Sequence, residues 1–270
     1  MGRKNISNSK FPQLSYTVSG KGVTLVLLHG FPLDGAIWDD SVQLLSEQYN
    51  VIVPDIPGCG ASTFSGEELS IEDIAESVRL ILEHEQIDKA IIAGHSMGGY
   101  AALAFAELFP DKILGLGLVH SFATPDNEEK KEHRRKSIEL FRKGGKEPFI
   151  GQMIPVLFAD ESKIIHREAV NNIKSRALLT ADTSLIAFYN AMINRPDRTS
   201  ILKDNTLPVL WIIGSDDTIA TTKNLMQQTS LSNVNFVYVY SNCGHMSMIE
   251  AKDRLCEDVG TFMSYCSNAV

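Results

Sequence analysis

The chain has 270 residues, of which 44% are hydrophobic and 21% are charged, a balance that argues against a disordered, collagen-like or coiled-coil protein. At roughly 150 residues per domain, this length favours one large domain with an insertion, and a chain of this size needs neither a disulfide nor a structural metal to form its core. The formal net charge of −8 repels phosphate groups and anionic membrane surfaces, so we expect neither a nucleic-acid partner nor a membrane partner.

The four cysteines contain no C-x-x-C pair and no His/Cys cluster with zinc spacing, which favours free thiols and no metal site. The first residues contain no apolar segment of the kind found in secretory signals. The longest apolar runs are far shorter than the ~20 residues of a membrane span. We therefore expect a cytoplasmic protein that uses no cofactor.

Seven short runs rich in aliphatic and β-branched residues are predicted to be strands. They cover residues 14–18, 23–28, 51–54, 90–93, 113–119, 208–213 and 234–240. Most are apolar throughout, as strands buried on both faces are, so the intervening segments must supply cover. The sequence predicts an α/β fold with a mostly parallel sheet of the eight-stranded type, flanked by helices.

Helical patterns lie between these strands. Ser70 and Asp73 form a capping arrangement for a helix that runs to about residue 85. A second helix begins at Met97 and is stopped by Pro110, and a last helix is expected over residues 249–265.

Residues 122–204 interrupt this alternation, because they contain no convincing strand and several helical segments. We predict a core domain of residues 1–121 and 205–270, with 122–204 inserted before the penultimate strand as a helical cap. The charge run at 128–136 is interpreted as a solvated helix face. Apolar cap residues are expected to form part of the pocket wall, namely Met153, Leu157 and Phe188.

The sequence GHSMG, residues 94–98, joins a predicted strand directly to a predicted helix. A serine on such a sharp turn presents its hydroxyl at the carboxyl edge of the sheet, and the flanking glycines relieve backbone crowding. The helix N-terminus favours negative charge that develops nearby. We therefore predict that Ser96 is a nucleophile.

A serine needs a base to take its proton, and the base needs a carboxylate to orient it. His245 lies in the loop after the last predicted strand and is the expected base, whereas His120, at the end of another strand, is an alternative that could instead line the pocket. Asp216 and Asp217 follow the strand 208–213, which gives the order Ser, Asp, His. Asp217 is the expected acid and Asp216 the alternative.

Acyl transfer also requires hydrogen-bond donors for an oxyanion. The sequence HGFP, residues 29–32, follows the strand 23–28, where a tight turn could direct the Phe31 amide to the same point as the Met97 amide. Pro32 has no N–H group. We predict that the backbone amides of Phe31 and Met97 form the oxyanion hole and that the Phe31 side chain contacts substrate.

The chain resembles the α/β-hydrolases, in the large group that includes carboxylesterases, enol-lactone hydrolases and cofactor-free haloperoxidases. The matching segments are 29–32 (HGFP), 55–62 (DIPGCGAS), 94–99 (GHSMGG), 214–217 (GSDD), and Gly244-His245 with Glu250. The resemblance implies the same triad and oxyanion hole, and it favours Asp217 over Asp216 because the family's acid commonly stands three residues beyond the glycine. Related dehalogenases and epoxide hydrolases carry an aspartate in place of Ser96, which argues against both activities.

The resemblance implies a metal-free serine hydrolase that cleaves a carboxylic ester, lactone or thioester through an acyl-enzyme. The cap offers apolar side chains and no evident cluster of positive charge, so we expect a small and largely apolar substrate. Three alternatives remain: a perhydrolase or haloperoxidase-like activity, hydrolysis of a carbon–carbon bond, and a ligand-binding receptor without turnover. The segment 218–220 lacks the proline that many relatives carry after the acid.

Overall fold

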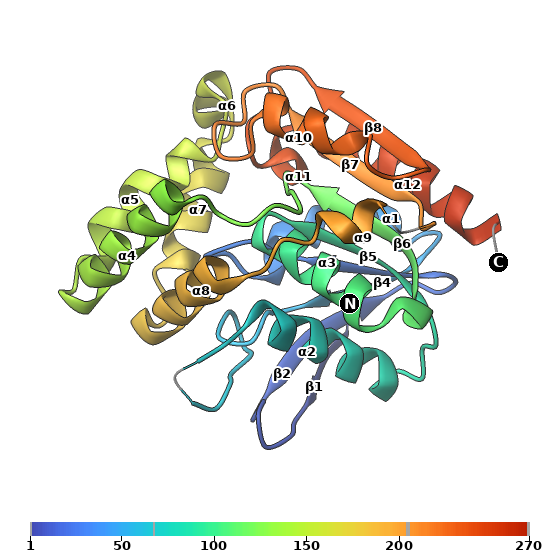
Figure 1. Cartoon of the computed structure of the whole chain (residues 1–270), viewed down its shortest axis with the longest axis horizontal. Coiled ribbons are helices and arrows are strands. Elements are labelled where there is room, and N and C mark those ends of the chain that lie inside the picture. Colours follow the sequence, from blue (N-terminus) through green and yellow to red (C-terminus); the bar gives the residue numbers. More distant parts are fainter. Residues whose placement is uncertain (1, 67, 204–205, 269–270) are drawn as a thin grey trace.

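A single eight-stranded sheet organises the computed structural model, which describes residues 2–66, 68–203 and 206–268 (Figure 1). The strand order is β1-β2-β4-β3-β5-β6-β7-β8. Strands β1 and β2 pair antiparallel with their neighbours, and the others run parallel. The predicted α/β fold is confirmed. The strands are β1 (Gly2–Ile6), β2 (Leu14–Ser19), β3 (Thr24–Leu28), β4 (Asn50–Pro54), β5 (Ala90–His95), β6 (Ile113–Val119), β7 (Val209–Gly214) and β8 (Asn235–Tyr240).

Helices cover both faces of this sheet. One face carries a hydrophobic cluster, here called cluster 1, into which α2 (Ile71–His84), α3 (Met97–Leu108) and α10 (Thr222–Thr229) pack. The opposite face carries cluster 2, into which α1 (Asp39–Leu45) and α12 (Lys252–Asn268) pack. Shorter helical segments are η1 (Gly35–Trp38), η2 (Pro110–Lys112) and α11 (Ser247–Glu250).

The continuous apolar runs of the strands follow from this two-sided burial. In β7, Val209, Trp211 and Ile213 point into cluster 1, whereas Leu210 and Ile212 point into cluster 2. Successive side chains of a strand point to opposite faces, so every position of a central strand must be apolar. These parallel strands also place their carboxyl ends along one edge of the sheet, where the candidate catalytic residues follow them.

Strand β1 is the one element of the sheet that the sequence did not predict. Its residues, GRKNI, are mostly exposed, and it pairs only with β2 at the edge of the sheet. A strand that buries almost no side chain has no need of an apolar pattern, so its composition carries no strand signal.

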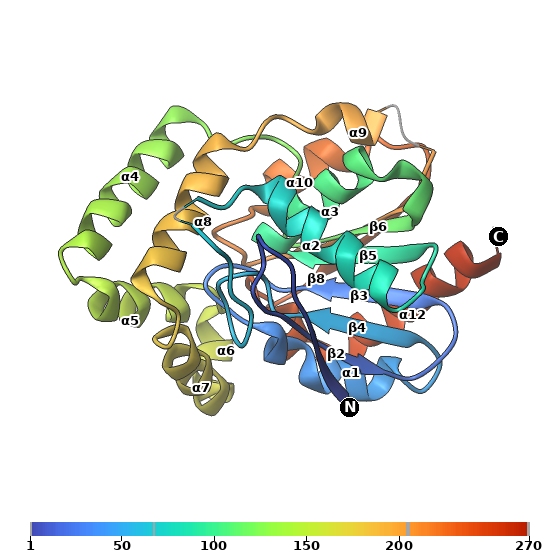
Figure 2. The ribbon, with the colours of Figure 1, turned by 90° about the horizontal axis from the view of Figure 1, so that it is seen from below.

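The insertion between β6 and β7 is helical. Figures 1 and 2 both show α4, α5, α7 and α8 gathered to one side of the sheet. The predicted boundary at residues 204 and 205 lies outside the described residues. The inserted helices are α4 (Glu128–Arg142), α5 (Lys146–Val156), α6 (Asp160–Ile165), α7 (Arg167–Ala177), α8 (Asp182–Asn194) and α9 (Thr199–Lys203).

These inserted helices share the hydrophobic clusters of the sheet. Side chains of α4 and α8 join cluster 1, and side chains of α5 and α7 join cluster 2. Among the residues described, none of the helices is both long and apolar enough to cross a bilayer.

The predicted N-terminal capping of helix α2 by Ser70 and Asp73 can be tested directly. Ser70 Oγ accepts a hydrogen bond from the Asp73 amide at 3.0 Å, and Asp73 Oδ2 accepts one from the Ser70 amide at 3.0 Å. We expect Ser70→Ala to lower the free energy of unfolding by about 1 kcal/mol, because the amides of the first turn lose an acceptor. Ser70→Gly should cost only a few tenths of a kcal/mol. Denaturant unfolding of the two variants measures the difference, and equal stability would contradict the cap.

Candidate active site

The turn between β5 and α3 holds Ser96 in an unusual backbone conformation. Its φ is +52° and its ψ is −115°, a combination that few side-chain-bearing residues adopt. The Ser96 amide donates to the Val119 carbonyl at 2.9 Å, and the Ser96 carbonyl accepts from Ser121 Oγ at 2.8 Å. Strain of this kind persists only where the surroundings hold it, and it is common at functional sites.

The glycines on each side of Ser96 allow close backbone approach. A Cβ atom on Gly98 would lie 2.6 Å from the His29 carbonyl oxygen and 2.8 Å from that of Leu28, and one on Gly94 would strike the backbone of Gly98. Helix α3 therefore begins almost in contact with β3 and β5. No larger residue fits at either position without moving the helix.

Asp217 lies in the loop after β7, where its side chain is fully buried. Its Oδ2 accepts hydrogen bonds from His245 Nδ1 at 2.7 Å and from His120 Nδ1 at 3.0 Å. Its Oδ1 accepts from the amides of Ile219 and Ala220 at 2.8 and 2.9 Å. Burial opposes ionisation of this carboxyl, but the charge of His245 and the hydrogen bonds from the two imidazoles hold its pKa well below the usual range.

Asp216 has a different environment. This residue is exposed, and its Oδ1 accepts a hydrogen bond from the hydroxyl of Ser215 at 2.8 Å. Among the hydrogen bonds of the described residues, none joins Asp216 to a histidine, so the structure brings Asp217 and not Asp216 to His245.

The bond to Asp217 sets the tautomer of His245. A carboxylate can only accept, so Nδ1 of His245 carries the proton and donates it, which leaves Nε2 of the neutral ring as an acceptor. The backbone of His245 is held as well, because His95 Nε2 lies 2.8 Å from the His245 carbonyl oxygen and donates to it. The His245 amide donates to the carbonyl of Leu157 at 2.6 Å.

His95 is a supporting residue that the sequence did not identify. Its side chain is buried against His245, with ring centroids 4.8 Å apart. Burial and the nearby charges of His245 and His120 hold the pKa of His95 well below its ordinary value, so this ring is neutral near pH 7. The only sequence signal was its place as the second residue of the G-x-S-x-G motif.

His120 was predicted as an alternative base or a pocket residue, and the structure places it against the carboxylate instead. It directly follows β6, has a φ of +51° and is 1% exposed. Its Nδ1 donates to Asp217, and its Nε2 is buried without a hydrogen-bond partner among the described residues. Burial lowers the pKa of His120, although the bond to Asp217 acts in the opposite direction.

The two predicted oxyanion amides belong to segments that adjoin Ser96. Met97 is the first residue of α3, so its N–H has no carbonyl four residues earlier within the helix to bind. The chain that carries Phe31 passes close to the serine, because a Cβ atom on Gly30 would be 3.0 Å from Ser96 Cβ.

The predicted cap residues lie at different distances from this group. Phe188 is fully buried with its ring edge-on to that of Phe31, at a centroid distance of 6.3 Å. Leu157 contacts His245 through its backbone carbonyl. Met153 is partly buried and packs against cluster 2.

Asp217 and its two imidazole partners are the one group of possible metal ligands found among the described residues. Ligand atoms of His120, Asp217 and His245 all lie within 4.8 Å of one another. Both imidazoles, however, already donate protons to one carboxylate oxygen, an arrangement that suits proton transfer rather than metal coordination.

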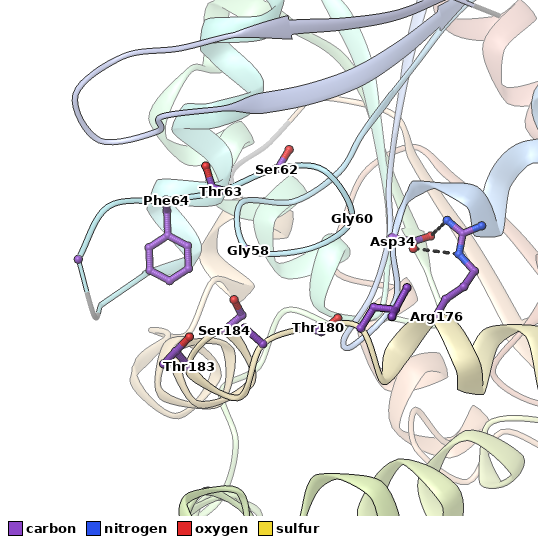
Figure 3. A pocket seen from close by; sticks show the side chains of 13 residues that line it. Asp34, Gly58, Gly60, Ser62, Thr63, Phe64, Arg176, Thr180, Thr183 and Ser184 are labelled. Atoms are coloured by element: carbon purple, nitrogen blue, oxygen red, sulfur yellow. Dashed lines mark hydrogen bonds and ion pairs between the residues drawn. The ribbon is translucent and has the colours of Figure 1, made fainter.

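A separate groove of about 340 Å³ lies between the loop around residues 58–66 and the helices α7 and α8 (Figure 3). A paired hydrogen bond between Arg176 and Asp34, at 2.6 and 3.0 Å, closes one end of it. None of Ser96, Asp217 and His245 lines this groove, so we place the chemistry at the sheet edge.

Comparison with known proteins adds independent evidence. A family model described as the alpha/beta hydrolase fold matches residues 23–252. The dihydrolipoyllysine-residue acetyltransferase component of an acetoin cleaving system from Pseudomonas putida is 28% identical over 253 residues, which cover 92% of this chain and 65% of that relative. The chain thus spans just under two thirds of that relative's length.

Two solved structures show how far the likeness extends. A thermophilic esterase from Thermogutta terrifontis, determined with malate bound, superposes with a TM-score of 0.93 at 28% identity and covers 99% of this chain and 100% of its own. The enol-lactonase from Burkholderia xenovorans has a TM-score of 0.85 at 21% identity, with 93% and 96% covered, and shows likeness of fold.

The adjacent aspartates provide a matched test of the triad acid. We expect Asp217→Asn to reduce kcat for a p-nitrophenyl ester by roughly 10⁴-fold, because the amide would favour the wrong tautomer of His245. Asp216→Asn makes the same change one residue away, on an exposed side chain, and should alter kcat little. A larger loss in the Asp216 variant would reverse the assignment.

The second imidazole on Asp217 predicts a change in pH dependence. His120→Gly accepts the positive φ but removes the donor, so we expect kcat to fall by roughly tenfold, the effect of losing one hydrogen bond to a charged group. The acidic limb of the kcat/KM profile should move to higher pH, because more negative charge would remain on the carboxylate that faces His245.

His120→Asn serves as the control for that variant, since asparagine tolerates positive φ and retains an N–H donor. It should restore part of the rate and move the limb back. An unshifted limb in His120→Gly would show that His120 only fills space.

Proposed function

Because the chain belongs to the alpha/beta hydrolase fold family, we propose that it is a serine hydrolase that cleaves a carboxylic ester, lactone or thioester. The 2.7 Å hydrogen bond from His245 to Asp217, beside a serine on a strained strand-to-helix turn, is the observation that supports this most. The esterase from Thermogutta terrifontis, similar over its whole length, favours an ester substrate.

In the proposed first step, Ser96 Oγ attacks the carbonyl carbon while its proton passes to His245 Nε2. Asp217 stabilises the imidazolium that forms. The carbonyl oxygen becomes negative and is bound by the amides of Phe31 and Met97. When the tetrahedral intermediate collapses, the leaving alcohol or thiol takes the proton from His245, and the acyl group remains on Ser96.

The second step repeats the chemistry with water. His245 Nε2 takes a proton from water as its oxygen attacks the acyl carbon, and the same amides bind the oxyanion. Collapse returns the proton to Ser96 Oγ and releases the acid. The three side chains are thereby regenerated, and no group outside the chain is required to balance the reaction.

The cysteines support our proposal that this enzyme is cytoplasmic. All four cysteines are free and buried. Burial raises the pKa of the Cys266 thiol to about 12, so it stays protonated and unreactive. Free thiols are usual in the reducing cytoplasm.

Hydrolysis of p-nitrophenyl esters with acyl chains of two to twelve carbons tests the proposal. We expect turnover of the shorter esters to fall by about 10⁶-fold in Ser96→Ala, because the nucleophile is removed. Ser7→Ala changes an exposed serine and is the matched control. Both variants should keep the Tm of the natural protein.

The outcome for Ser96→Ala decides between assignments. Retained activity with an unchanged Tm would exclude Ser96 as the nucleophile. Turnover at no chain length, in either the natural protein or the control, would contradict a general esterase activity.

A further inference from the structure

Two arginines share the carboxylate of Asp126 where α4 begins and α8 ends, and a lysine lies one helical turn from one of them. The Asp126 side chain is fully buried, and its Oδ2 accepts from Arg134 Nε at 2.6 Å while its Oδ1 accepts from Arg195 Nη2 at 3.1 Å. Lys130 lies one helical turn before Arg134 on α4. The group therefore carries more positive than negative charge.

Arg195 is fully engaged with the protein. Its Nη1 donates to the Met192 carbonyl at 2.7 Å and its Nη2 to the Thr124 carbonyl at 3.0 Å, and its guanidinium lies 3.9 Å from the centroid of the Tyr100 ring. Its side chain is 2% exposed. Arg195 with Asp126 is thus a structural pair that joins the end of α8 to the start of α4.

Arg134 and Lys130 are not satisfied in this way. Arg134 bonds to Asp126 only through Nε. Its two Nη groups have no hydrogen-bond partner among the residues that the structure describes, although its side chain is only 19% exposed. The Lys130 ammonium lies 5.0 Å from the centroid of the Phe122 ring and forms no ion pair with any residue that the structure describes.

Such an arrangement is unfavourable for the protein alone. Lys130 and Arg134 lie one turn apart on the same helix and repel each other. Arg134, whose side chain is 19% exposed, also loses part of its solvation. Burial and the charges of Arg134 and Arg195 lower the pKa of Lys130, although Asp126 and Asp217 act in the opposite direction. An anion between Lys130 and Arg134 would relieve both costs.

Two aromatic rings connect Arg134 to the candidate catalytic group. The Arg134 guanidinium lies 5.2 Å from the centroid of the Tyr189 ring, and that ring stacks on Phe31 with centroids 4.5 Å apart. Phe31 carries a proposed oxyanion amide, so Arg134 lies on the same side of the inserted helices as the proposed site of cleavage.

We propose that Lys130 and Arg134 form a subsite for a carboxylate carried by the substrate, at the end remote from the bond that is cleaved. The inference rests on the proposed function and refines the expectation of a largely apolar substrate. The charge run at 128–136 was interpreted as a solvated face, and Lys130 is exposed as that interpretation expects, although its ammonium lies over the Phe122 ring. Arg134 departs from it, because its side chain is only 19% exposed and lies against the Tyr189 ring. The free Nη groups of Arg134 can bind both oxygens of a carboxylate.

Two esters of equal acyl length test this subsite. Mono-p-nitrophenyl adipate carries a terminal carboxylate that p-nitrophenyl hexanoate lacks. We expect the natural protein to have the higher kcat/KM for the adipate ester, and this ratio to fall by about tenfold in Lys130→Gln, the loss expected for one charged contact. High salt should reduce the ratio as well.

Lys136→Gln is the matched control, because it removes the same charge from an exposed position on the same helix. Its ratio should equal that of the natural protein. A ratio below one in the natural protein, or the same ratio in both glutamine variants, would overturn the subsite.

Binding separates failure of the subsite from failure of the proposed reaction. Calorimetry of adipate with Ser96→Ala needs no turnover, so it reports on the subsite even if no ester is cleaved. We expect about tenfold weaker binding when Lys130→Gln is added and no change when Lys136→Gln is added. Arg134→Lys keeps the charge beside Asp126 without the fork and should also weaken adipate binding; unaltered affinity would remove Arg134 from the subsite.

Discussion

A buried carboxylate with four hydrogen-bond donors holds the candidate site together. Asp217 follows β7, one of its imidazole donors follows β6, and the other follows β8, so a single side chain connects the loops after three neighbouring strands. A buried charge is stable only when it is paired and hydrogen-bonded, and this requirement fixes His120 and His245 relative to each other. The amides of residues 219 and 220 meet the same requirement, and His95 bonds to the carbonyl of His245 rather than to the carboxylate.

Most of the fold could be predicted from the sequence, because two-sided burial gives central strands such as β5 and β7 continuous apolar runs. Caps and breakers fixed helix ends, as the reciprocal bonds of Ser70 and Asp73 show. Strand β1 could not be predicted, since its pairing with β2 uses backbone groups that every residue has. The helical character of the segment between β6 and β7 was predicted from its lack of strand patterns, but the packing of its helices was not.

The candidate site was predictable where local sequence dictates local geometry and less so where contacts join distant segments. The strand–turn–helix pattern identified Ser96, whereas Asp216 and Asp217 differ only in how their loop turns, which spacing alone does not specify. The bond between His120 and Asp217 spans 97 residues. The partial burial of Arg134 could not be predicted, because exposed charged residues surround it on α4.

The hydrogen bond from the His245 amide to the Leu157 carbonyl joins the inserted helices to the backbone of the base. The amide of Ala159, two residues further on, donates to Glu250 at 2.9 Å, and the Glu250 carboxylate also accepts from the Gly244 amide at 3.1 Å. The insertion is therefore not an interchangeable module. A chimera that received these helices from a homologue would also need the same backbone conformation at residues 157–159. Without it, His245 would be displaced.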